Sequence, residues 1–501
     1  MQLRKPHTSE LADSSAAELS DAPASSPKLN GLKGDARDRA AEKKRRLARK
    51  HEFRSRTSPL DFETLEREQN PMRGFFVLFW TFMAFYVLVT AYQNWRRDGF
   101  IVSLRFYFIF SQDAWGLIKA DAAMVGSMFF SVVFQKLFVW GLIPRAQVRI
   151  VQHTLQSIWF AACLFTVFWK SWPWIQSGFF VLHSIAMMFK MHSYNAYNIE
   201  LFFKNLRLQK LRKLVAAHKK DDDAPRSPTS PVTPSSPTLT GFDDPQSPDA
   251  IRAEITLLER ELVKPSHAYP NNITFFNFID YLLVPTLVYE LEYPRTKDFR
   301  PLYFLQKAAA TFATFGLLYI SYEHYIHPVL LDMSNLGFFD SFMQLLMPFM
   351  MCYLLIFFII FECICNAFAE LTFFADREFY DDWWNSVTFD EFARKWNKPV
   401  HEFLLRHVYL ESITSYKLSK NDATLLTFFL SSCVHELVMV IIGKRLRFYL
   451  FFMQMFQIPL IYISRLPFFR GRKTAGNAFF WFGMFMGPPL LAVVYMREHY
   501  A

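Results

Sequence analysis

The stretch LLTFFLSSCVHELVMVIIG, Leu425 to Gly443, shows what kind of protein this chain forms. It has no lysine or arginine and is almost wholly apolar, which predicts a helix that crosses a membrane, since such a helix takes about 20 mostly apolar residues. His435 and Glu436 stand side by side near its middle. Because ionisable side chains at membrane depth are costly, this pair predicts a functional cavity lined by protein.

Apolar runs of this kind recur along the chain of 501 residues, of which 52% are hydrophobic and 57 are Phe. We predict an all-α polytopic membrane protein with about nine spanning helices and with amphipathic helices in a large cytoplasmic loop. The predicted spans are Gly74–Trp95, Ala122–Ile143, Ile150–Trp169, Ser171–Phe189, Leu302–Tyr322, Ser341–Phe361, Ala423–Ile442, Phe448–Ser464 and Thr474–Met496.

Two segments differ in composition from these spans. Residues 1–70 are rich in Ser, Ala and charge and include the basic run KKRRLARK, Lys43–Lys50, so we expect a disordered basic cytoplasmic arm. Residues 215–250 include a Pro/Ser/Thr-rich stretch, which predicts a disordered cytoplasmic insertion within a single membrane domain, residues 71–501. The basic run indicates the cytoplasmic side and anionic lipid, and we expect no nucleic-acid partner.

Lys and Arg in the loops predict a cytoplasmic N-terminus and, with an odd number of spans, a luminal C-terminus. Two basic loops oppose this topology, because Arg96–Arg97 and Lys444–Arg447 would both be luminal. Either short interfacial helices lie there or the number of spans differs by one.

The loop between the predicted sixth and seventh spans, residues 362–422, carries too many aromatic side chains for a solvated linker. From Thr388 onwards apolar residues recur every three to four positions, which predicts an amphipathic helix at the membrane surface, interrupted or kinked by Pro399. Asn397 and His401 would share one face if that helix continues. Four basic residues are expected to attract an anionic ligand here: Arg377, Arg394, Lys395 and Lys398.

The heptapeptide FYDDWWN, Phe379 to Asn385, resembles the FYxDWWN signature of the sterol and diacylglycerol O-acyltransferases, a branch of the membrane-bound O-acyltransferase family. KWNKPVH supplies the motif asparagine of that family, Asn397, and SSCVHE supplies its catalytic histidine, His435. The resemblance covers the chain from about Gly74 to its end, without the Ser/Pro-rich insertion.

The resemblance implies an enzyme that moves a long-chain acyl group from acyl-CoA to an alcohol, with His435 and Asn397 as catalytic residues. Imidazole, with an ordinary pKa of about 6.5, suits a base that takes the hydroxyl proton. Asn397 would hold the thioester carbonyl oxygen by a hydrogen bond. The resemblance implies these substrate-binding residues: Phe379, Tyr380, Asp382, Trp383, Trp384, Asn385, Trp396, His401, Glu436 and Gln457.

Several of these positions have a structural alternative. Asp382 to Asn385 resemble residues around the acyl-CoA entrance but are equally compatible with packing, and His401 with a helix-surface position. Glu436 points about 100° away from His435 on a helix, which favours bracing the cavity over a catalytic pair. HELVM has Met439 where a zinc-binding HExxH has its second histidine, so we expect no metal and no cofactor, acyl-CoA being a co-substrate.

PTLVYELEYPRTK, HELVM and the long Ser/Pro insertion look most like the fungal sterol acyltransferases. The expected acceptor is therefore a membrane sterol of the ergosterol or cholesterol type, esterified for storage. A diacylglycerol acyltransferase is the first alternative and a membrane transporter the second. The resemblance further implies a multi-pass protein of the endoplasmic reticulum membrane that forms a homodimer or homotetramer.

Overall fold

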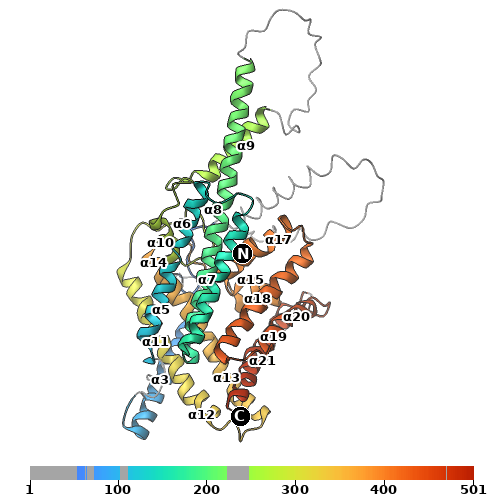
Figure 1. The fold of residues 1–501 in the computed structure, drawn as a ribbon. Coiled ribbons are helices and arrows are strands. Elements are labelled where there is room, and N and C mark those ends of the chain that lie inside the picture. Colours follow the sequence, from blue (N-terminus) through green and yellow to red (C-terminus); the bar gives the residue numbers. More distant parts are fainter. Residues whose placement is uncertain are drawn as a thin grey trace, which may run out of the picture. The chain divides into compact units, whose positions relative to one another are not determined.

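Helices build most of the described chain in the computed structural model (Figure 1). It describes residues 53–61, 64, 73–101, 111–222, 248–469 and 471–500. The basic run at residues 43–50 and most of the Ser/Pro-rich insertion lie outside these residues. Within them no strand forms, and the β pairing is limited to three isolated bridges. The predicted all-α class is confirmed for this part of the chain.

Six helices of the described chain are long and apolar enough to cross a membrane. They are α3 (Arg73–Asp98), the consecutive α5 (Ala114–Ser127) and α6 (Phe130–Val139), α7 (Val148–Lys170), the continuous run α13 (Phe338–Phe357), η2 (Phe358–Ile364) and α14 (Cys365–Leu371), α18 (Lys420–Gly443), and α21 (Lys473–Tyr500).

The other three predicted spans have a different helical structure. Residues 171–189 belong to the much longer helix α8 (Trp174–Asp222), and residues 302–322 form α11 (Pro301–Ser321) followed by the π-helical turn η1 (Tyr322–Ile326). Residues 448–464 are divided at Phe456 into α19 (Tyr449–Met455) and α20 (Gln457–Ser464), each too short to cross a bilayer alone.

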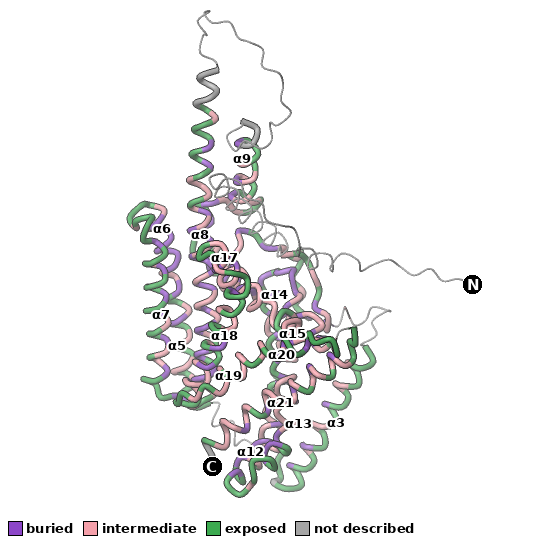
Figure 2. The backbone as a smooth tube through the Cα atoms, turned by 90° about the vertical axis from the view of Figure 1, so that its right-hand side faces the viewer, coloured by how far each residue is buried: buried purple, intermediate pink, exposed green. Residues whose placement is uncertain are grey.

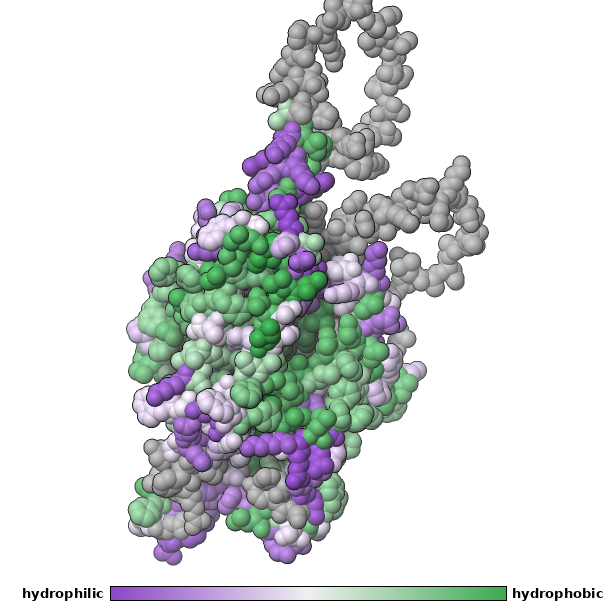
Figure 3. Space-filling view, in the orientation of Figure 1, coloured by the Kyte–Doolittle hydropathy of each residue, from purple (hydrophilic) through white to green (hydrophobic). Residues whose placement is uncertain are grey.

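The outer surface of the helices is apolar, as a lipid-facing surface should be. Along α3, Phe75 is 69% and Phe85 63% exposed, although both are large hydrophobic side chains. Figure 2 shows α3 at one edge and α5, α6 and α7 at the other, with α8 and α18 between them. Hydrophobic residues gather over the middle of the face in Figure 3, whereas the α8 and α9 pair is hydrophilic.

Helix α8 is the longest element, with 49 residues and a length of about 74 Å at 1.5 Å per residue. Its first half packs against α5, α6, α7 and α18. Its last turns pair with α9 (Pro248–Leu262) through the ion pairs Arg207–Glu254 at 3.1 Å and Arg212–Glu259 at 2.7 Å. Residues 215–222 and 248–250, which we predicted as disordered, are therefore helical.

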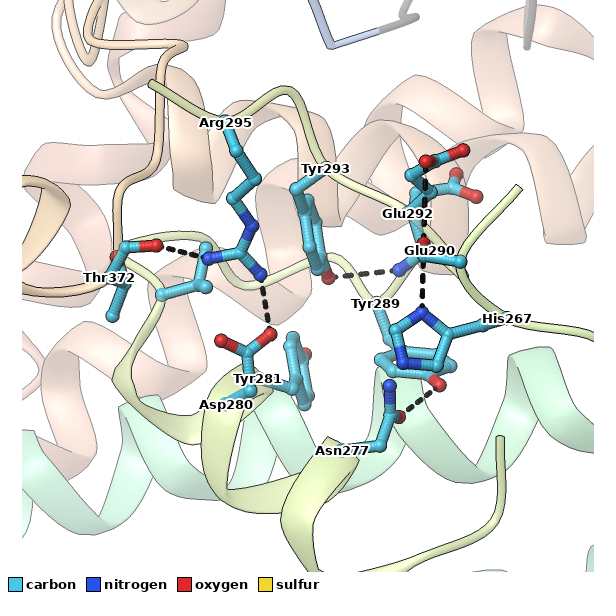
Figure 4. Close-up of polar contacts among 12 residues, drawn as sticks. His267, Asn277, Asp280, Tyr281, Tyr289, Glu290, Glu292, Tyr293, Arg295 and Thr372 are labelled. Carbon is cyan, nitrogen blue, oxygen red and sulfur yellow. Dashed lines mark hydrogen bonds and ion pairs between the residues drawn. The ribbon is translucent and has the colours of Figure 1, made fainter. Parts of the chain in front are cut away.

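The connection from α9 to α11, which includes α10 (Phe275–Leu283), is held by the polar contacts drawn in Figure 4. Arg295 forms an ion pair with Asp280 at 2.5 Å and donates a hydrogen bond to the carbonyl oxygen of Thr372. The Tyr293 hydroxyl accepts a hydrogen bond from the backbone N–H of Glu290 at 2.9 Å. The Arg295–Thr372 bond joins this connection to the end of α14.

Residues 53–61 form an N-terminal strap that packs on the loop after α14. The guanidinium of Arg56 makes two hydrogen bonds to the Asp376 carboxylate, at 2.8 and 2.7 Å. The ring of Phe53 packs between those of Tyr293 and Phe374, at 5.4 and 5.9 Å. The prediction that residues 1–70 form a disordered arm is wrong for the strap. Its apolar and ionic partners lie more than 230 residues away, so local composition could not reveal them.

Candidate functional site

His435 lies on α18, and its ring is oriented by its own helix. The ring Nδ1 is 2.8 Å from the carbonyl oxygen of Ser431, one turn earlier. A carbonyl oxygen only accepts hydrogen bonds, so Nδ1 must carry the proton and donate it. In the neutral ring Nε2 then has a free lone pair. Because the side chain is exposed on α18, that nitrogen is available as a base.

Glu436 lies on a different side of α18 and is buried, with 4% of its surface exposed. Its carboxylate accepts hydrogen bonds from the backbone N–H groups of Phe448 at 2.6 Å and Phe451 at 3.1 Å. Phe448 immediately precedes α19 and has a left-handed φ of 62°. The carboxylate thus fixes the turn from α18 to α19, as expected for a bracing residue rather than a partner of His435.

The FYDDWWN segment lies between α14 and α15 (Phe389–Lys395), and its large side chains belong to the protein core. Phe379, Tyr380 and Trp383 are 3%, 0% and 2% exposed. The Trp383 ring lies 4.7 Å from the Trp396 ring and 5.7 Å from the Trp481 ring. The segment therefore holds the loop against α21 and against the end of α15.

Trp384 is connected to α21 by its backbone. Its carbonyl oxygen accepts hydrogen bonds from Asn477 Nδ2 at 2.8 Å and from Trp481 Nε1 at 3.1 Å. Both donors lie on α21, so these two hydrogen bonds fix the backbone at Trp384. The indole ring of Trp384 takes no part in them and is half-buried.

Asp382 and Asn385 form the accessible edge of the same segment. Lys395 lies 2.7 Å from Asp382, whose side chain is 45% exposed, and Asn385 Nδ2 donates to Asp382 at 3.3 Å. Partial burial by itself raises the pKa of Asp382, but the hydrogen bonds from Lys395 and Asn385 outweigh it and hold that pKa below its usual value. The carboxylate is therefore ionised at neutral pH.

The four basic residues that we expected to attract an anionic ligand are all paired in the structure. Each forms an ion pair with a neighbouring carboxylate: Arg377–Glu370 at 2.6 Å, Arg394–Asp390 at 2.9 Å, Lys395–Asp382 at 2.7 Å and Lys398–Glu378 at 2.8 Å. Arg377 is also only 3% exposed. The expectation that these four residues attract an anionic ligand is therefore wrong for Arg377, which is buried, and weakened for the other three by their partners.

Beneath the FYDDWWN segment lies a buried network of charges that the sequence did not reveal. The Tyr380 hydroxyl donates to Glu362 at 2.9 Å, and the Ser58 hydroxyl of the strap donates to the same carboxylate oxygen at 2.5 Å. Lys307 of α11 binds the other oxygen at 2.7 Å. Lys307 also lies 3.7 Å from Asp61, again in the strap. One signal was visible, because Lys307 interrupts a predicted span and Glu362 ends another.

We expect the Lys307→Met substitution to destabilise the protein by about 3–5 kcal/mol, because it leaves the buried Glu362 carboxylate without its cation. The double variant K307M/E362Q removes both charges and should recover much of that loss. Thermal unfolding in detergent, followed by tryptophan fluorescence, measures both effects.

The matched control for this prediction is Arg394→Met. It removes an ion pair with Asp390 in which the Arg394 side chain is 55% exposed, so the cost should be about 0–1 kcal/mol. A double variant no more stable than K307M would show that charge balance at Glu362 is not what Lys307 provides.

Asn397 separates two short helices. The predicted amphipathic helix ends at Lys395 (α15) and begins again at Lys398 (α16, Lys398–Phe403), so the break precedes Pro399, which lies in the first turn of α16. The Asn397 Oδ1 accepts a hydrogen bond from the Val400 N–H at 3.1 Å and caps α16. Asn397 and His401 therefore do not share a helix face as predicted, because Asn397 has non-helical backbone angles.

The capping bond uses the side-chain oxygen of Asn397, so the amide nitrogen Nδ2 takes no part in it. Among the described residues no hydrogen bond is formed by Nδ2, so this group is a donor open to a ligand. The preceding residue is held firmly, since the Trp396 ring stacks on Tyr353 at 4.7 Å with an angle of 13°. Asn397 thus has a fixed backbone, an occupied acceptor and an available donor.

The remaining predicted residues have local contacts. His401 is half-buried, and its backbone N–H donates to the Asn397 carbonyl at 2.9 Å. Gln457 donates to Gln454 at 2.6 Å across the break between α19 and α20. Both positions are structurally defined, and neither is shown by these contacts to bind a substrate.

The chain that connects Asn397 to the helix of His435 is made of short helical segments. After α16 the chain continues as the π-helical η4 (Leu404–Tyr409) and α17 (Leu410–Thr414), and both pack against α18. The structure therefore places Asn397 at the head of the segment that lies on the helix of His435. A π-helical segment at this position is typical of functional sites.

The η4 segment is also connected to α8 by a buried serine. Ser193 of α8 lies 2.8 Å from His407 Nε2 in η4 and accepts a hydrogen bond from the Tyr289 N–H at 2.9 Å. Ser193 thus joins three segments that are far apart in the sequence.

Known proteins resemble this chain over most of its length. The family model described as membrane-bound O-acyltransferase matches residues 145–497. A probable sterol O-acyltransferase 1 of Schizosaccharomyces pombe is 36% identical, over 85% of this chain and 82% of its own length. Sterol O-acyltransferase 2 of Saccharomyces cerevisiae is 34% identical over 84% and 66%. Diacylglycerol O-acyltransferase 1-2 of rice is 33% identical over 46% and 50%.

Proposed function

This chain belongs to the membrane-bound O-acyltransferase family, and from that membership we propose that it is an acyl-CoA-dependent sterol O-acyltransferase. The observation that carries the chemistry is His435, an imidazole with Nδ1 bound to Ser431 and Nε2 free, on an apolar helix. The choice of a sterol rests on relatives named sterol O-acyltransferase that match most of the chain, whereas the rice diacylglycerol enzyme matches 46% of it.

In the proposed reaction His435 Nε2 takes the proton of the sterol 3-hydroxyl as its oxygen attacks the thioester carbonyl carbon. The carbonyl oxygen gains negative charge, and the Asn397 Nδ2 donates a hydrogen bond to it. The carbon–sulfur bond then breaks, and the departing sulfur of coenzyme A takes the proton from the imidazolium. The products are a steryl ester and free coenzyme A, and no cofactor is needed.

The proposed substrates reach this site from two directions. The nucleotide end of acyl-CoA stays in the cytoplasm, beside the edge formed by Asp382 and Asn385, while the acyl thioester reaches inward to His435. The sterol enters sideways from the bilayer. An apolar surrounding limits water and so protects the thioester from hydrolysis.

We also propose where this chain is located in the cell, how it crosses the membrane and how it assembles. It lies in the endoplasmic reticulum membrane with a cytoplasmic N-terminus, spans it about nine times when the shorter apolar helices are included, and forms a homodimer or homotetramer.

The test offers labelled oleoyl-CoA to the purified protein in lipid nanodiscs, with ergosterol and diacylglycerol in parallel reactions. We expect steryl ester to form faster than triacylglycerol. Triacylglycerol as the main product would replace the sterol proposal by the diacylglycerol alternative. Hydrolysis or no turnover with either acceptor would contradict both.

A further inference from the structure

Asn397 lies in the break between α15 and α16, and both ends of that break are bound to the FYDDWWN segment. The Asp381 N–H donates to the carbonyl oxygen of Lys395 at 2.9 Å, and the Lys398 N–H donates to the carbonyl oxygen of Phe379 at 3.0 Å. Asn397 lies between these two backbone bonds. The position of its side chain therefore depends on where the FYDDWWN segment lies.

The N-terminal strap pairs with the residues that immediately precede this segment. The Arg56 N–H donates to the Ala375 carbonyl oxygen at 3.0 Å, and the Arg377 N–H donates to the Arg56 carbonyl oxygen at 2.9 Å. Together they form the parallel bridge between Arg56 and Asp376. Two backbone bonds alone hold a pair of strands weakly, so the side chains of the strap decide how firmly it is docked.

The Arg56 side chain connects the strap to the residue next to Asn397. Its guanidinium makes two hydrogen bonds to the Asp376 carboxylate, and its Nη1 lies 2.5 Å from Glu378 Oε2. The same Oε2 atom accepts a hydrogen bond from Lys398 Nζ at 2.8 Å. Glu378 thus lies between two cations, one in the strap and one that directly follows Asn397 in the chain.

Loss of the Arg56 cation would affect a buried carboxylate. Asp376 is 4% exposed, and Arg56 is its ion-pair partner among the described residues. An unpaired buried charge is costly, so the carboxylate would move towards water. That movement would shift the loop that leads into FYDDWWN and, with it, Asn397. A displacement of about 1 Å in the catalytic geometry can lower a rate by about 10²-fold.

We propose that Arg56 is a positioning residue for acyl transfer, which acts through Glu378 and Lys398 on the place of the Asn397 donor. This role rests on the proposed function, since the Asn397 Nδ2 is the group proposed to bind the thioester carbonyl oxygen. The strap precedes residues 145–497, which match the family model, and it thereby becomes part of the catalytic unit.

The test is a double-mutant cycle in kcat, measured on the purified full-length protein in lipid nanodiscs with oleoyl-CoA and ergosterol. Arg56→Met should lower kcat by about 10–100-fold and change KM for acyl-CoA little. In the Asn397→Asp background, which keeps the capping oxygen and lacks the donor, R56M should lower kcat little further, because no donor is left to misplace. A strap that only stabilises the fold would lower kcat by the same factor in both backgrounds.

The matched control is Arg54→Met. Arg54 also belongs to the strap, but its side chain is exposed, and its backbone N–H, which methionine retains, donates to Asp376 at 3.0 Å. R54M should keep the wild-type kcat. Should R56M fail to fold, R56K is used in the same cycle, because lysine keeps a cation beside Asp376 but lacks the two-pronged contact.

A wild-type kcat in R56M would overturn the positioning role, and so would equal losses from R56M in the two backgrounds. Failure of the sterol proposal is a different result, namely triacylglycerol as the main product of wild type. The cycle is run with whichever acceptor wild type esterifies, so that result would leave the role of Arg56 to be decided by the cycle itself.

Discussion

Replacing His435 with alanine should lower the rate of acyl transfer by about 10²–10⁴-fold, the range that general-base assistance contributes. Nδ1 is hydrogen-bonded to the Ser431 carbonyl, so only Nε2 is available to take the hydroxyl proton. His435→Gln tests this more closely, since its amide can still donate to Ser431 but is no base. Both variants should lose kcat to a similar degree, measured as steryl ester formed per purified enzyme.

Cys433→Ala is the control for His435, because Cys433 is exposed on the same helix two residues away. It should keep wild-type turnover. All three variants should give the same elution profile and unfolding temperature as wild type, since the hydrogen bond of His435 is to its own helix. A His435 variant that keeps more than about a tenth of wild-type kcat, far above the expected range, would show that another group takes the proton.

Asn397→Ala and Asn397→Asp separate the two roles that the structure gives this side chain. Aspartate keeps the oxygen that caps α16 through the Val400 N–H, but it lacks the Nδ2 donor. If Nδ2 holds the developing oxyanion, both variants lose about 10²–10³ in kcat with little change in KM for acyl-CoA. Only the alanine variant should also lose the cap, at about 0.5–2 kcal/mol of stability.

Thr388→Ala provides the matched cap-loss control for Asn397. The Thr388 hydroxyl caps α15 by accepting from the Glu391 N–H at 3.3 Å, in the same loop but without a proposed part in catalysis. It should lower the unfolding temperature as Asn397→Ala does and leave kcat near wild type. An Asn397→Asp variant with normal kcat, or one in which KM alone rises, would rule out the oxyanion role.

The apolar helices could be predicted from the sequence because hydropathy is a local property. The runs Gly74–Trp95 and Ile150–Trp169 correspond to α3 and α7. Helix α8 was recognised only in part, because its inner face buries polar side chains such as Ser184, Lys190 and Asn198, which lower the hydropathy of a buried helix as much as of an exposed one.

The candidate site was predicted less completely, and the reason is distance along the chain. Asn397 and His435 stand in recognisable motifs, but the capping bond of Asn397 depends on a helix break between Lys395 and Lys398, whereas the sequence predicted the interruption at Pro399. The network around Glu362 joins Ser58 and Tyr380, with separations of 304 and 18 residues. Such pairings follow from the tertiary fold, so composition and periodicity could not indicate them.

The ion pair between Lys307 and Glu362 constrains how the chain is made. Lys307 leaves the ribosome in the second turn of α11, 55 residues ahead of Glu362. A lone lysine opposes insertion by up to about 2.5–3.5 kcal/mol on the translocon scale, the value for the centre of a helix. Pairing with Glu362 offsets this cost, so we expect α11 and the helix that carries Glu362 to enter the bilayer together rather than one after the other.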